Sequence, residues 1–180
     1  TTVYSFNELS EDAKQKAIES NYYINVGHEW FDYIIDEFKH NEKDFNVDKV
    51  YFSGFHSQGD GAMFEYDGIS DDLKDEFIDN LNLSPMRTNW LKNNTSVSAK
   101  GNQSGHYYHE KSCSHSIYWE IDNGDLHRST NFYKWLERWL ESFADMFENF
   151  VISRYEDKCI ELYSKLSHSY DYLTSDEEIE

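Results

Sequence analysis

The sequence predicts an α+β fold, in which an antiparallel sheet of about five strands is packed by N-terminal helices and a long C-terminal helix. Three observations predict it: apolar residues follow a helical period before residue 41, follow strand patterns over residues 47–66 and 95–121, and return to a helical period after residue 129. Aromatic residues make up 17% of the 180 residues, which is enough to build a core despite the high charge. We expect an α+β core over residues 1–128, a long helix or helix pair over 129–170 and an acidic tail over 171–180.

Two helices are expected at the N-terminus. Asn7 or Ser10 can cap the first, which places Ala13, Ala17 and Ile18 on its inward face. The second is expected over residues 27–40, where five large apolar side chains fall on one face: Trp30, Phe31, Ile34, Ile35 and Phe38.

The middle of the chain is expected to form the sheet. Residues 47–55 and 62–66 predict a hairpin, joined by a glycine turn over residues 57–61. Further strands are expected at the following ranges: 95–100, 105–111 and 114–121. A short acidic helix over residues 71–81 and a connection over 83–94, which contains the only proline, separate the two groups of strands.

The last part of the chain predicts a long helix, capped by Ser129 or Thr130. Apolar residues keep a helical spacing from Phe132 to Leu166 without Pro or Gly, so one helix of about 35 residues or two helices with a break near Ser153 would fit. This apolar stripe is larger than a small sheet needs, and a homodimer through the helix is therefore one expectation.

The charge is strongly acidic, with 35 acidic and 16 basic residues and a formal net charge of −19. Nucleic acid and anionic membranes would repel such a surface, so we expect neither as a direct partner. No apolar run reaches the ~18 residues of a membrane span, and two cysteines make no disulfide framework. These features are typical of a reduced cytoplasmic protein.

The acidity is concentrated between residues 60 and 79. This stretch has eight carboxylates against Lys74 alone: Asp60, Glu65, Asp67, Asp71, Asp72, Asp75, Glu76 and Asp79. Spaced carboxylates can imitate a phosphate backbone, which carries one charge per ~1.7 Å of duplex axis. We therefore expect these residues to bind a partner, while the alternative is a solvated face that maintains solubility.

One cluster has the side chains of a metal site. His106, His109, Cys113 and His115 have the residue types that zinc prefers, although their spacing is not a common structural-zinc pattern. The alternative is a sheet rich in Tyr and His. Phosphate-binding loops, nucleotide-binding glycine motifs and the common hydrolase and metalloprotease motifs are absent, so we expect no catalytic residue and no cofactor.

Two motifs carry a resemblance. Residues 51–62, YFSGFHSQGDGA, and residues 105–110, GHYYHE, together with the opening segment 3–19, resemble small proteins of bacteriophages and mobile elements. Such proteins are mostly uncharacterised, and some carry an antitoxin-like label. The resemblance implies a phage or mobile-element origin and supplies no catalytic residues. Met63 stands where many of these proteins are expected to have Cys.

Charge and resemblance together predict a non-enzymatic phage anti-defence protein. It would act in the cytoplasm of an infected bacterium, as an acidic DNA mimic that binds the nucleic-acid or PAM-reading surface of an immune nuclease of the CRISPR or restriction type. Two alternatives stay open: an antitoxin that sequesters a basic toxin, and a metal-dependent enzyme that uses the His/Cys cluster.

Overall fold

The fold is that of a computed structural model in which residues 4–122 and 131–179 are described. The chain forms two compact units, Asn41–Glu161 and a smaller unit of Thr1–His40 with Leu162–Glu180. The predicted α+β class is confirmed. The C-terminal helix α5 (Asn131–Leu173) groups in part with the sheet and in part with the N-terminal helices.

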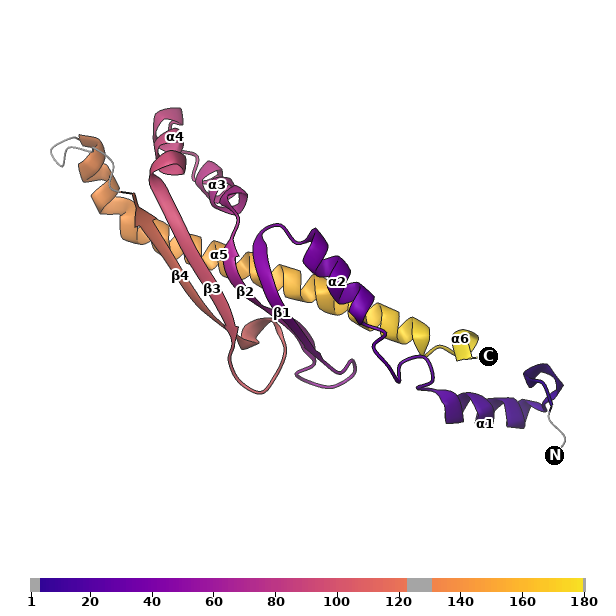
Figure 1. The fold of residues 1–180 in the computed structure, drawn as a ribbon. Coiled ribbons are helices and arrows are strands. Elements are labelled where there is room, and N and C mark those ends of the chain that lie inside the picture. The colour runs from indigo at the N-terminus through magenta and orange to yellow at the C-terminus, as the bar shows by residue number, and fades with distance from the viewer. Residues whose placement is uncertain (1–3, 123–130, 180) are drawn as a thin grey trace. The chain divides into compact units, whose positions relative to one another are not determined.

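The larger unit contains one antiparallel sheet of four strands in the order β1-β2-β3-β4 (Figure 1). The strands are β1 (Phe45–Ser53), β2 (Gly61–Ile69), β3 (Thr95–Gln103) and β4 (Cys113–Ile121). The hairpin β1–β2 is confirmed, with Ser53 opposite Gly61.

The expected fifth strand over residues 105–111 is wrong. This segment is a loop that ends in the short 3-10 helix η2 (Glu110–Ser112). Gly105 has a φ of 99°, which turns the chain away from β3. The loop then packs over the first residue of β2 instead of pairing as a strand.

Two helices connect β2 to β3. The acidic helix α3 (Asp71–Asn80) is confirmed, and Ser70 caps it by accepting a hydrogen bond from Leu73 N at 3.1 Å. The expected connection over residues 83–94 is instead largely the helix α4 (Pro85–Asn94). Proline begins this helix rather than breaking it, because the first turn needs no backbone N–H from that residue.

The core of the larger unit lies between one sheet face and residues 131–161 of α5 (Figure 1). Phe64 of β2 packs on Tyr155 with ring centroids 4.6 Å apart, and Trp119 packs on Phe147 at 4.8 Å. Phe77 of α3 contacts Phe147 at 5.1 Å, which ties α3 to the same core. The other sheet face is mostly exposed along β3 and β4.

The smaller unit is helical. It contains the 3-10 helix η1 (Phe6–Glu8), α1 (Glu11–Asn21), α2 (Asp32–Asn41), the end of α5 and the short helix α6 (Asp176–Ile179). Ser10 occupies the N-cap position of α1, and Asn7 lies in η1. The helix α2 begins five residues later than predicted, and the preceding Trp30 packs against Tyr170 at 5.9 Å.

The helix α5 is continuous. It has 43 residues without a break at Ser153, and it runs three residues beyond the predicted end at 170. The predicted caps Ser129 and Thr130 lie outside the described residues. Within residues 4–122 and 131–179, no helix combines the length and the apolar character needed to cross a membrane.

Candidate partner-binding surface

The eight predicted carboxylates lie on three different elements. Asp60 lies in the turn between β1 and β2, Glu65 and Asp67 lie on β2, and the other five lie on α3. Sequence proximity therefore does not place all eight on one surface. Asp67 is exposed and lies 3.8 Å from Lys100 of β3, and the surroundings of the other seven separate them into two kinds.

Asp60 and Glu65 stabilise the fold. Asp60 Oδ2 accepts hydrogen bonds from the backbone N–H of His56 at 3.0 Å and of Ser57 at 2.7 Å, which closes the turn. Glu65 accepts a hydrogen bond from Gln103 N at 3.2 Å, and its side chain is only 17% exposed. That backbone hydrogen bond is the main reason why the pKa of Glu65 is lowered, with smaller contributions from Lys49 and Tyr51.

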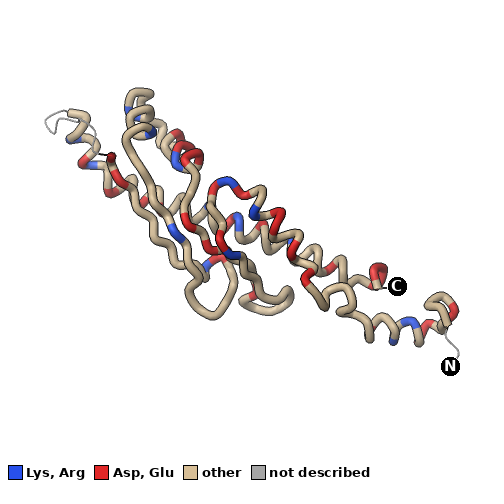
Figure 2. Tube along the Cα trace, viewed as in Figure 1, with Lys and Arg blue, Asp and Glu red and all other residues tan. Residues whose placement is uncertain are grey.

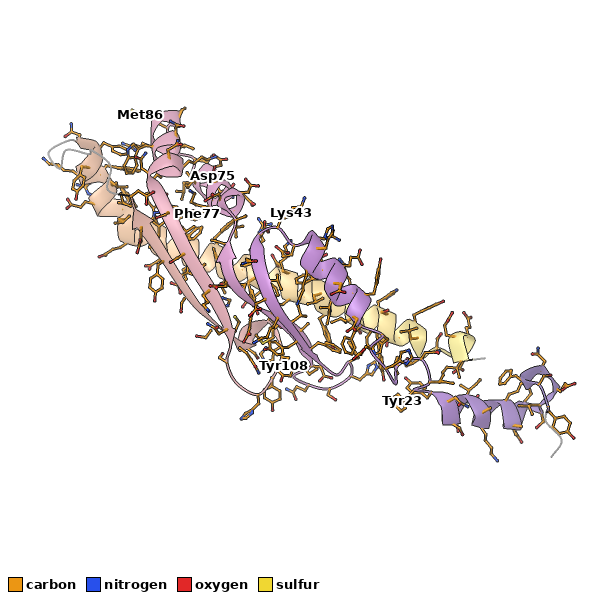
Figure 3. All side chains as sticks on the ribbon, in the orientation of Figure 1. Tyr23, Lys43, Asp75, Phe77, Met86 and Tyr108 are labelled. Atoms are coloured by element: carbon orange, nitrogen blue, oxygen red, sulfur yellow. The ribbon has the colours of Figure 1, made fainter. Side chains whose placement is uncertain are left out.

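Four of the five α3 carboxylates are exposed, and Asp75 is half-buried. Leu73, Phe77 and Ile78 take the buried face of the helix, so the acidic residues between them face solvent (Figure 3 labels Asp75 and Phe77). The side chains of Asp79 and Asp71 are 58% and 92% exposed. Asp72 is exposed as well. We call Asp71, Asp72, Asp75, Glu76 and Asp79 the α3 acidic ridge.

Cations of neighbouring elements lie beside the α3 acidic ridge. Lys92 of α4 lies 2.8 Å from Asp79 and 3.8 Å from Asp75, and Arg154 of α5 pairs with Glu76. These exposed pairs contribute little to stability, about 0–1 kcal/mol each. The stability of the fold therefore depends little on these ion pairs, whereas the bonds of Asp60 and Glu65 are part of the fold.

The smaller unit is more acidic for its size. It has 13 acidic and four basic residues among 59, while the larger unit has 22 and 12 among 121. Figure 2 shows the acidic residues along α2 and α3 and few charges along β3 and β4. The sequence indicated the acidic tail over residues 171–180, but it did not show that this tail groups with the N-terminal helices, because the two segments come from opposite ends of the chain.

A groove of about 650 Å³ also lies in the smaller unit. It is lined by Ile34 and Glu37 of α2 and by α5 residues that include Lys165, His168 and Tyr172. Tyr172 is 59% exposed and donates a hydrogen bond to Glu178. No local motif could have indicated this groove, because its two walls are more than 120 residues apart in sequence.

The predicted His/Cys cluster is divided by the structure. His109 Nδ1 accepts a hydrogen bond from Lys111 N at 3.1 Å and lies in the loop, whereas His115 lies on the buried face of β4 with Cys113 Sγ 3.9 Å from its Nδ1. In the described part of the chain, no three or more His, Cys, Asp or Glu side chains form a group suited to a metal ion. The geometry therefore gives the metal-dependent alternative no support.

The two motifs of the resemblance pack against each other. Tyr108 stacks on Tyr51 with ring centroids 5.2 Å apart, and the Tyr107 ring lies beside Gly59. At Gly61, an added Cβ would lie 2.6 Å from the His109 Cβ, so only glycine allows the loop to approach β2 this closely. Both motifs thus contribute to one packing arrangement at the end of the sheet.

A buried polar cluster lies between the sheet and α5. Tyr66 Oη and His115 Nδ1 are 2.9 Å apart, and Tyr155 Oη lies 3.2 Å from Phe64 N and 2.9 Å from Phe64 O. Burial raises the pKa of both tyrosines and of the Cys113 thiol, and it raises the pKa of Cys159 to about 12. These thiols are therefore protonated at neutral pH, which disfavours nucleophilic chemistry.

The same burial makes His115 a source of pH sensitivity. Burial lowers the pKa of His115, so the unfolded chain binds a proton more readily than the native protein. The free energy of unfolding should therefore fall as the pH falls below about 6.5, the ordinary value for histidine. We expect a His115→Gln variant to lose less stability than the wild type between about pH 7 and pH 5 in parallel urea titrations. Equal losses in the two proteins would contradict this assignment.

A family model for a domain of unknown function, DUF8835, matches residues 30–176. The chain belongs to the DUF8835 family. The match begins two residues before α2 and ends in α6, so the DUF8835 region includes the whole sheet, α3 and α5. Neither the curated proteins nor the solved structures contain a significant match.

Proposed function

We propose that this DUF8835 protein is a non-enzymatic inhibitor that binds the basic, nucleic-acid-binding surface of another protein. A bacterial immune nuclease of the CRISPR or restriction type is the partner that we favour, and the PAM-reading or DNA-binding surface is the expected target. The exposure of the α3 acidic ridge is the observation that carries the proposal, because its carboxylates can exchange their present cations for those of a partner.

The geometry of the ridge suits a phosphate-binding surface. Asp72, Glu76 and Asp79 are exposed and follow one another at intervals of four and three residues, so they lie on one side of α3. These intervals correspond to about 6 Å and about 4.5 Å along the helix axis. The phosphates of one DNA strand follow at about 3.4 Å of duplex axis, so the three carboxylates form a sparser row of negative charges that Arg and Lys side chains of such a surface can contact.

The remaining charge would act at longer range. The smaller unit carries nine net negative charges, and these attract a basic partner before contact and raise the association rate. Exposed tyrosines in this unit, Tyr23 at 65% and Tyr33 at 75%, are the side-chain type that anchors protein interfaces.

The test compares two triple variants. Asp72→Asn, Glu76→Gln and Asp79→Asn remove three of the five carboxylates of the α3 acidic ridge. Glu141→Gln, Asp145→Asn and Glu148→Gln remove three exposed carboxylates from α5 and change the net charge equally. Both variants and the wild type serve as bait in extracts of infected bacteria, and captured nucleases are then tested in DNA-cleavage assays.

We expect the wild type to inhibit cleavage by a captured nuclease, with short duplex DNA in excess relieving the inhibition. The ridge variant should associate about tenfold more slowly in surface plasmon resonance, and the α5 variant should differ by less than about threefold. Inhibition that neither duplex DNA nor salt weakens would overturn the proposal. Capture of a small basic toxin in place of a nuclease would favour the antitoxin alternative.

A further inference from the structure

The strand β4 forms one edge of the sheet. Each of its backbone N–H and C=O groups points either toward β3 or outward from the sheet edge. Asp122 N donates to Asn94 O at 2.9 Å, and Ser104 N donates to Ser112 O at 2.7 Å, which extends the β3–β4 register at both ends. Hydrogen-bonded pairs alternate in an antiparallel ladder. The even-numbered residues 114–120 therefore bond to β3, and the odd-numbered residues 113–121 direct their N–H and C=O groups outward.

These outward groups form an open edge in the part of the chain that the structure describes. No hydrogen bond recorded between residues of 4–122 and 131–179 satisfies them. In addition, β4 pairs with β3 over nine consecutive residues without a bulge, and it contains neither proline nor lysine. Regular edges of this kind are templates for a further strand.

The opposite edge of the sheet, formed by β1, has features that protect it from pairing with another strand. Along β1 the register shifts twice, between Phe45 and Val47 and between Val47 and Val50, and Lys49 lies on the strand. Bulges and lysines are the devices by which proteins protect an edge from pairing. The contrast indicates that β4 is the edge that can accept another strand.

The charge around β4 favours a second copy of this chain as the occupant. Residues 95–121, which hold β3, β4 and the loop between them, have two acidic and two basic residues, so their formal charge is zero in a protein of −19. Two copies would repel each other least where these hairpins meet. Glu120 is the only Asp, Glu, Lys or Arg in β4, so no two like charges need to face each other.

We propose that β4 pairs antiparallel with β4 of a second copy about a two-fold axis, which joins the two sheets into one continuous sheet. We place the two-fold axis at Ile117, so that the two copies of Ile117 face each other. Ser116 then lies opposite Tyr118 of the second copy, and Ser114 lies opposite Glu120 of the second copy. The odd-numbered residues then exchange their outward hydrogen bonds, as an isologous interface requires.

Two double variants of the full chain test both the interface and its register. Ser116 and Tyr118 are exposed on the outer sheet face, so both variants should fold, which circular dichroism verifies. Ser116→Glu with Tyr118→Glu places like charges opposite each other twice across the two-fold axis. Ser116→Glu with Tyr118→Lys places opposite charges at the same two positions.

Sedimentation equilibrium measures the dimer affinity of the wild type and of both variants. We expect a wild-type dimer that tightens between about 50 mM and 500 mM NaCl, because salt screens the repulsion between the acidic copies. The Glu/Glu variant should dimerise at least about tenfold more weakly, and the Glu/Lys variant should recover the wild-type affinity. A wild type that stays monomeric at high salt would refute the proposal, as would equal dimerisation of both variants, which would place the contact elsewhere, for example on α5.

Discussion

A Gly101→Ala substitution is expected to lower the free energy of unfolding by about 3 kcal/mol. Gly101 of β3 lies opposite Tyr66 of β2, whose ring lies over the glycine. A Cβ at this position would lie 2.6 Å from Tyr66 Cδ1 and 2.9 Å from Cys113 Sγ. Tyr66 cannot give way easily, because its side chain is 1% exposed and packs against Phe45 at 4.8 Å.

Urea unfolding of the variant and of a matched Ser98→Ala control measures this effect. Ser98 lies on the exposed face of the same strand, so its substitution should change stability by less than about 0.5 kcal/mol. The contact also predicts coupling: Gly101→Ala combined with Tyr66→Leu should cost at least about 1 kcal/mol less than the two single changes together. If the two losses of free energy of unfolding are additive, the contact with the Tyr66 ring is not the cause of the destabilisation by Gly101→Ala.

Periodicity predicted the elements whose structure is decided locally. The hairpin β1–β2, α3 and α5 each have an apolar pattern that persists over many residues, and each occurs close to its predicted range. The loop over residues 105–111 alternates like a strand, yet tertiary packing decides its conformation. Its Tyr108 and His109 fit against Tyr51 and Gly61, which lie about 50 residues earlier.

The same reason limits prediction of the candidate site. The sequence shows the acidic run, but it does not show that Lys92 and Arg154 reach the α3 acidic ridge from other helices. Nor does it show that Glu65 binds a backbone N–H of β3. Exposure and pairing separate the carboxylates available to a partner from those that stabilise the fold, and both depend on contacts between distant segments.

A Tyr155→Phe substitution is expected to lower the free energy of unfolding by about 2 kcal/mol, although it removes one oxygen atom. Tyr155 Oη bonds both Phe64 N at 3.2 Å and Phe64 O at 2.9 Å. These are backbone groups of β2 at a point where its recorded pairing with β3, limited to Tyr66–Gly101 and Asp67–Lys100, does not extend. The hydroxyl of α5 therefore adds two hydrogen bonds to the backbone of β2 at Phe64.

Without the hydroxyl, the N–H and C=O of Phe64 each lose one buried hydrogen bond, and phenylalanine supplies none in its place. Thermal and urea unfolding measure the loss, and Tyr4→Phe is the matched control because Tyr4 is 62% exposed. Native-state hydrogen exchange supplies a local readout: the amide of Phe64 should exchange much faster in Tyr155→Phe, beyond what the global loss of stability explains. A Tyr155→Phe variant as stable as the control would mean that β2 recruits β3 or water instead, and that the sheet does not depend on α5 for this bond.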